Sequence, residues 1–91
     1  MASEQRKVVF SGDVQGVGFR FTACRIAGRY DVTGYVRNLP DGRVECMVEG
    51  DGVQVGAFID DLAETMKGYV RGRTESIAPY SGRFGGFTVA Y

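Results

Sequence analysis

The chain has 91 residues, and 11 lysines and arginines balance 11 aspartates and glutamates, so its formal net charge is zero. This length suits one compact domain spanning residues 1–91, and the balanced charge argues against a protein that binds nucleic acid mainly by neutralising phosphates. The sequence contains no histidine, which removes the commonest general base and the commonest metal ligand.

Two features of the sequence concern where the protein works. No apolar run approaches the roughly 20 residues that a membrane-spanning helix needs, and the N-terminal residues lack the apolar region of a signal peptide. We therefore expect a cytoplasmic protein with no membrane partner. We also expect it to be a monomer. In the reducing cytoplasm, Cys24 and Cys46 are expected to be unpaired thiols that are buried or half-buried.

Apolar periodicity and turn residues predict seven regular elements. In chain order they are a strand at 8–10, a helix at 19–30, strands at 32–38 and 44–49, a helix at 53–66, a strand at 69–77 and a short last strand at 87–91. This order is the split βαβ pattern with one terminal strand added. It predicts an α+β, ferredoxin-like sandwich in which two helices cover one face of an antiparallel sheet.

The loop between the first predicted strand and the first helix, residues 12–20, combines three glycines with one arginine. Glycine permits a tight turn whose backbone N–H groups point inward, and the start of a helix adds further unpaired N–H groups. Arg20 places a forked positive charge beside them, so the loop predicts a pocket for an oxyanion such as a phosphoryl group. The alternative is that Gly16 and Gly18 serve only a tight strand-to-helix turn.

Asn38 ends the predicted strand at 32–38. In the predicted topology the first two strands run parallel, with the third strand between them, so their carboxyl ends lie at the same edge of the sheet. Asn38 is therefore expected beside the glycine loop, where its amide can hold a water molecule in line with a bound phosphoryl group. The alternative is a residue that only initiates the turn at 39–42.

Residues 12–20 and 34–44 together resemble the two-part signature of the acylphosphatase family. They read Gly-Asp-Val-Gln-Gly-Val-Gly-Phe-Arg and Gly-Tyr-Val-Arg-Asn-Leu-Pro-Asp-Gly-Arg-Val, and the similarity in length and element order extends over nearly the whole chain. The resemblance implies hydrolysis of an acyl phosphate to a carboxylate and inorganic phosphate, with no metal, cofactor or covalent intermediate. The implied partners are a small-molecule acyl phosphate as substrate and inorganic phosphate as product or inhibitor.

The resemblance also assigns roles to individual residues. Arg20 matches the arginine that binds the phosphoryl group, and Asn38 matches the asparagine that orients the attacking water. The residues that match the phosphate-binding backbone cradle are Gln15, Gly16, Val17, Gly18 and Phe19.

Several charged or substituted positions near this signature lead to separate expectations. Asp13 stands where many relatives carry a basic residue, so we expect a weaker positive field in the loop. Leu39 replaces a hydroxyl residue found in some relatives, so one supporting hydrogen bond is expected to be missing. Arg71 and Arg73 share one strand face and are expected to pair with acidic residues or with the C-terminal carboxylate of Tyr91.

Two other functions remain open from the sequence. The chain can be a catalytically silent or accessory acylphosphatase-like domain that binds phosphate, as occurs within larger maturation enzymes. Residues 83–91 also show a weak similarity to the aromatic signature of RNA-recognition motifs, which share the ferredoxin-like fold. The spacing of these aromatic residues and the neutral net charge both argue against RNA binding.

Overall fold

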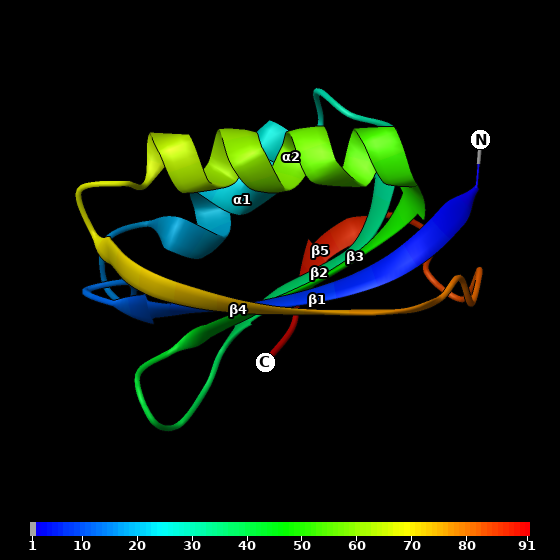
Figure 1. The fold of residues 1–91 in the computed structure, drawn as a ribbon. Helices are drawn as coiled ribbons and strands as arrows, with labels where there is room; N and C mark the ends of the chain where they lie inside the picture. Colours follow the sequence, from blue (N-terminus) through cyan, green and yellow to red (C-terminus); the bar gives the residue numbers. More distant parts are fainter. Residues whose placement is uncertain (1) are drawn as a thin grey trace.

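The computed structural model describes residues 2–91. The elements are β1 (Ser3–Gly12), α1 (Phe19–Ala27), β2 (Val32–Asn38), β3 (Val44–Asp51), α2 (Gly52–Thr65), β4 (Val70–Pro79) and β5 (Phe87–Val89). The strands form one sheet in the order β4-β1-β3-β2-β5, and both helices cover the same face of it (Figure 1). The predicted ferredoxin-like α+β fold is therefore confirmed.

The sheet is antiparallel except at one edge. β1 pairs antiparallel with β3 and β4, and β2 pairs antiparallel with β3. β5 runs parallel to β2, with register from Gly34↔Phe87 to Val36↔Val89. The last strand thus turns the sheet into a mixed one, which the element order alone had not indicated.

Only the strand at 32–38 has the predicted ends; the ends of the other elements shift, and those of β1 and α1 shift furthest. β1 begins at Ser3 rather than at Val8, because its polar first half is paired with β3, where Ser3 lies opposite Asp51. α1 ends at Ala27 rather than at residue 30, and Gly28 is its C-cap. Hydrophobic periodicity marks only the half of β1 that faces the core, so it misses the polar half.

The hydrophobic core fills the space between the helices and the covered face of the sheet. Each helix contributes the apolar stripe that its helical spacing predicts. Buried residues from the helices are Phe19, Ala23, Ile26, Ala27, Val55, Phe58, Ile59 and Leu62. Cys46 is buried in β3 and Cys24 is half-buried on α1, and both are unpaired, as predicted.

Glu49 of β3 is a fully buried carboxylate that anchors the loop between β4 and β5. It accepts hydrogen bonds from the Gln5 side chain, from the Ser81 backbone N–H and hydroxyl, and from the Gly82 N–H, at 2.7–3.0 Å. Burial by itself raises the pKa of the Glu49 carboxyl, but the hydrogen bonds outweigh that effect and hold this pKa below its ordinary value. The charge is thereby tolerated in the interior.

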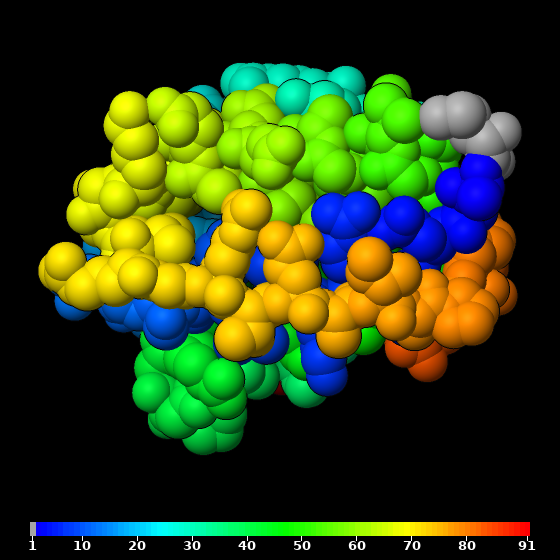
Figure 2. Space-filling view, viewed as in Figure 1, coloured from blue at the N-terminus to red at the C-terminus, as the bar shows by residue number. Residues whose placement is uncertain are grey.

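The register brings the ends of β1 and β2 together. Phe10 of β1 and Asn38 of β2 both lie opposite Val44 of β3, on its two sides. The glycine loop after β1 and the turn between β2 and β3 therefore share one edge of the sheet, as predicted. That turn projects from the body of the molecule (Figures 1 and 2). No helix among residues 2–91 is long and apolar enough to span a membrane.

Candidate active site

The loop between β1 and α1 depends on glycine conformations. Gly16 and Gly18 have φ values of 78° and 76°, in the left-handed region that favours glycine. Gly18 is the N-cap of α1 and offers no side-chain cap. The Thr22 N–H donates to the Gly18 carbonyl at 2.9 Å, so the N–H groups of Phe19, Arg20 and Phe21 precede the first helical hydrogen bond. These donors suit an anion.

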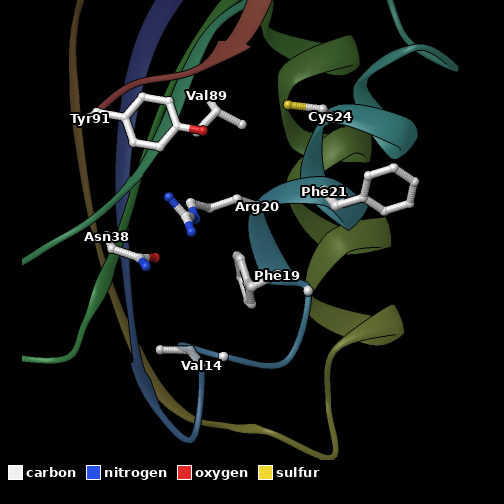
Figure 3. A pocket seen from close by; sticks show the side chains of 10 residues that line it. Val14, Phe19, Arg20, Phe21, Cys24, Asn38, Val89 and Tyr91 are labelled. Carbon is white, nitrogen blue, oxygen red and sulfur yellow. The ribbon is translucent and has the colours of Figure 1, made fainter.

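Arg20 is a half-buried arginine for which the described residues provide no carboxylate partner. Six of the nine arginines in the chain do contact a carboxylate. Arg25 and Arg83 also lack one, but both are exposed. The Arg20 guanidinium instead faces the side chain of Asn38 (Figure 3) and lies 5.5 Å from the centre of the Tyr91 ring. A cation held in this way at a helix start is unfavourable unless an anion joins it.

Asn38 comes from the end of β2 and lines the same cleft as Arg20. Its amide points toward the guanidinium (Figure 3). In residues 2–91 this amide has no protein hydrogen-bond partner, so its donor and acceptor positions are both available to a ligand or water.

Gln15 connects the glycine loop to the turn that follows Asn38. Its Nε2 atom donates to the Leu39 carbonyl at 2.8 Å and to the Arg43 carbonyl at 3.0 Å. The same turn is closed by the Leu39 N–H, which donates to the Arg43 carbonyl at 2.8 Å. The side chain of Gln15 therefore ties together the two segments that carry Arg20 and Asn38, a role that the sequence pattern did not indicate.

A cleft of about 340 Å³ opens between these segments. Its lining residues are Val14, Gly16, Gly18, Phe19, Arg20, Phe21, Cys24, Asn38, Val89 and Tyr91. Among the predicted site residues, Gly16, Gly18, Phe19, Arg20 and Asn38 thus come together. Gln15 and Val17 belong to the same loop but do not line the cleft, and Val17 packs against the core.

Five lining residues lay outside the sequence-based prediction: Val14, Phe21, Cys24, Val89 and Tyr91. Of the two partners expected for Arg71 and Arg73, the acidic residues are observed: Arg71 pairs with Asp13 and Arg73 with Glu75. Tyr91 instead places its ring beside Arg20. The signal that could have found Val89 and Tyr91 is the pairing of β5 with β2. Two parallel neighbours end at the same edge, so the end of β5 reaches the cleft.

The two departures from the family signature lie outside the cleft lining. Asp13 accepts a hydrogen bond from Arg71 at 2.7 Å, and both side chains are exposed. The carboxylate of Asp13 is thus opposed by a local positive charge, which limits its effect on the loop. The side chain of Leu39 does not line the cleft, but its carbonyl accepts the hydrogen bond from Gln15.

Comparison with known proteins gives one family. The acylphosphatase family model matches residues 6–89. A curated acylphosphatase of Methanospirillum hungatei is 44% identical over 66 residues, which is 72% of either chain. One of Acaryochloris marina is 52% identical over 54 residues, which is 59% of this chain and 58% of that protein. The chain therefore matches a little over half the length of the first such relatives.

Solved structures resemble this fold over almost its full length. The crystal structure of acylphosphatase from Bacillus subtilis has a TM-score of 0.87 at 26% identity and covers 97% of this chain and 99% of that one. The crystal structure of Thermococcus kodakarensis HypF has a TM-score of 0.82 at 31% identity and covers 96% of this chain but 12% of HypF. The same fold thus occurs alone and as a small part of a larger protein.

Proposed function

This chain belongs to the acylphosphatase family, and we propose that it hydrolyses an acyl phosphate to a carboxylate and inorganic phosphate. The observation that carries the proposal is the half-buried guanidinium of Arg20. It has no carboxylate partner among residues 2–91, and it faces the glycine loop and Asn38 across one cleft. Such a charge is stabilised when a phosphoryl group completes the site.

The phosphoryl group binds between Arg20 and the loop at 15–19. Backbone N–H groups of the loop and of the first turn of α1 donate to its oxygens, while the Arg20 fork contacts two of them. These donors are already in place before the substrate arrives, because Gly16 and Gly18 hold the loop conformation and Gln15 ties the loop to the β2–β3 turn. Such preorganised donors stabilise charge that accumulates on the phosphoryl oxygens in the transition state.

Asn38 holds the attacking water. The water oxygen forms a bond to phosphorus, the bond from phosphorus to the acyl oxygen breaks, and the carboxylate leaves with the electron pair. A phosphoryl oxygen of the substrate takes the proton of the water, so the step needs no protein base. The carboxylate is a good leaving group, and positioning of water together with charge stabilisation accounts for the catalysis.

Hydrolysis of benzoyl phosphate by the purified protein, without added metal, tests this function. The wild-type protein is expected to accelerate the reaction over buffer, and Asn38→Ala to reduce kcat about 100-fold, since the variant loses the group that orients water. Inhibition by inorganic phosphate should change less than about threefold in Asn38→Ala. No acceleration by the wild-type protein would reject the enzyme, and full turnover by Asn38→Ala would reject the role of Asn38.

Three further parts of the proposal concern where the protein works and what it binds. The unpaired thiols of Cys24 and Cys46 support a cytoplasmic location. We also propose that the protein is a monomer. We propose further that it binds no nucleic acid, because the ring of Phe87 packs against that of Phe58, with 5.2 Å between the ring centres, and is unavailable for stacking on bases. Gel filtration should give a mass of 9.9 kDa for the monomer, and an RNA-binding assay should detect no binding.

One alternative function has a specific observation in its favour. The similarity to a small part of HypF fits an accessory domain that binds phosphate without turnover. Such a domain would retain phosphate binding through Arg20 and would leave benzoyl phosphate intact. The same assay, run with a separate measurement of phosphate affinity, therefore distinguishes the accessory domain from the enzyme.

A further inference from the structure

The direction of the Asn38 amide has to be set by the strand that carries it. Among residues 2–91 this amide has no protein hydrogen-bond partner, and it reaches the cleft from the last residue of β2 (Figure 3). Beyond Asn38 the chain enters the projecting turn at 39–43 (Figure 1). The end of a strand frays more easily than its middle, so an amide that holds a water in line requires a restraint at this end.

One such restraint lies one residue before Asn38, on the other face of the sheet. Successive side chains of a strand alternate between faces, so Arg37 points to the face that lies away from both helices, while Asn38 points into the cleft. Arg37 lies directly opposite Glu45 of β3, in the register position next to that of Asn38. Its Nε atom donates to the Glu45 carboxylate. The ion pair therefore joins the two strands immediately before Asn38.

The carboxylate of this pair is buried, which distinguishes it from an ordinary surface ion pair. Glu45 is only 6% exposed, although both helices cover the opposite face of the sheet. The Tyr35 hydroxyl donates to it at 3.2 Å, and the Arg37 guanidinium lies 5.8 Å from the centre of the Tyr35 ring. A partly buried pair is screened less by salt than an exposed one, and its charge-assisted hydrogen bond has a defined geometry. The contact can therefore hold the two strands in a fixed relation.

The ion pair and Gln15 restrain Asn38 from two sides. Gln15 holds the turn that follows Asn38 through two backbone carbonyls, and the ion pair holds the residue that precedes it. We propose that the Arg37–Glu45 ion pair positions Asn38, acting through the backbone of β2 from the face of the sheet opposite the cleft. This inference rests on the proposed function, and it adds to it two positioning residues that do not touch the substrate.

The test replaces both members of the pair together, because removing one alone leaves an uncompensated buried charge. Arg37→Met combined with Glu45→Met keeps unbranched side chains on both strands and should lower kcat for benzoyl phosphate about tenfold. Inhibition by inorganic phosphate should change less than about threefold, since Arg20 and the glycine loop are unaltered. In Asn38→Ala, which lacks the positioned amide, the same double replacement should lower kcat less than about twofold.

Two further variants accompany the double replacement. Arg6→Met combined with Glu75→Met removes another ion pair of the same sheet, between β1 and β4, and should keep the wild-type kcat. Tyr35→Phe keeps the ring and removes one hydrogen bond to Glu45. It should lower kcat about threefold in the wild-type background and leave kcat unchanged in Asn38→Ala.

The possible results separate the inference from the function on which it rests. An unchanged kcat in the double replacement, or the same proportional loss with and without the Asn38 amide, overturns the positioning role and leaves the proposed function standing. Weaker phosphate inhibition in parallel with the loss of kcat means that the pair only supports the fold of the site, which also overturns it. If the double replacement does not fold, Tyr35→Phe decides by the same criteria. Failure of the wild-type protein to hydrolyse benzoyl phosphate overturns the function and the positioning role together.

Discussion

Replacing Arg20 by methionine should separate catalysis from stability. The substitution keeps the aliphatic stem and removes the guanidinium, which has no carboxylate partner among the described residues. Two charge-assisted hydrogen bonds to a phosphoryl group contribute about 1.5–3 kcal/mol each. Their loss should lower kcat/KM for benzoyl phosphate by about 10²- to 10⁴-fold and phosphate affinity by about 100-fold or more.

The same substitution should change the stability of the folded protein very little. Removing a cation from the first turn of α1 stabilises the helix by about 0.3–1 kcal/mol, and losing the contact with the Tyr91 ring costs a similar amount. The free energy of unfolding should therefore stay within about 0.5 kcal/mol of wild type, or about 2–4 °C in Tm. A buried structural ion pair would behave in the opposite way, because removing one partner would leave an uncompensated charge.

Steady-state kinetics, phosphate inhibition and thermal melts of three variants check this reasoning. Arg20→Lys keeps the charge without the fork and should lose about tenfold in kcat/KM. Arg25→Met, on the same helix and exposed, should keep wild-type kinetics and phosphate inhibition. If inorganic phosphate inhibits Arg20→Met as strongly as wild type, or if that variant melts more than about 8 °C lower, the assignment of Arg20 is refuted.

Two more predictions concern residues that act through the fold. Gln15→Leu removes both hydrogen bonds to the β2–β3 turn and should lower kcat about tenfold and the free energy of unfolding by about 1–2 kcal/mol. The control Gln54→Leu loses one hydrogen bond elsewhere and should keep the wild-type kcat. An equal loss of kcat in both variants would contradict the role of Gln15 in joining the two segments. Glu49→Gln should destabilise the protein by about 2 kcal/mol at pH 7, measured by urea unfolding. Because the pKa of Glu49 is lowered on folding, its contribution is present above the unfolded pKa of about 4.3 and is lost as pH falls through the folded pKa. The gap between wild type and variant should therefore shrink below about pH 4, and a gap constant from pH 7 to pH 3 would exclude this account.

Most of the fold was predictable because the apolar pattern repeats locally. Both helical stripes and the strand at 32–38 are where periodicity placed them. The segment at 3–7 was not recognised as strand, because its side chains are polar and only its pairing with β3 and β4 makes it extended. Hydrogen bonds to distant strands leave no periodic pattern in a polar sequence.

The residues of the candidate site were likewise predictable from the sequence only in part. Gly16, Gly18 and Arg20 could be found because glycines at positive φ and an arginine at a helix start are local features. Asn38 followed from the topology, since parallel strands end at a common edge. The bridging side chain of Gln15 could not be predicted, because its acceptors are backbone carbonyls, and any residue supplies those.

The sequence by itself determined the order of the elements, the glycine loop and the presence of an arginine at the start of the first helix. Only the tertiary structure decided what surrounds that arginine. The parallel pairing of β5 with β2 brings Val89 and Tyr91 to the cleft, and the pairing of Arg71 with Asp13 opposes the negative charge in the loop. The physical reason is that conformational preference acts only over a few neighbouring residues along the chain. Contacts such as Arg71 with Asp13 join residues 58 positions apart, and the packing of the whole chain selects them.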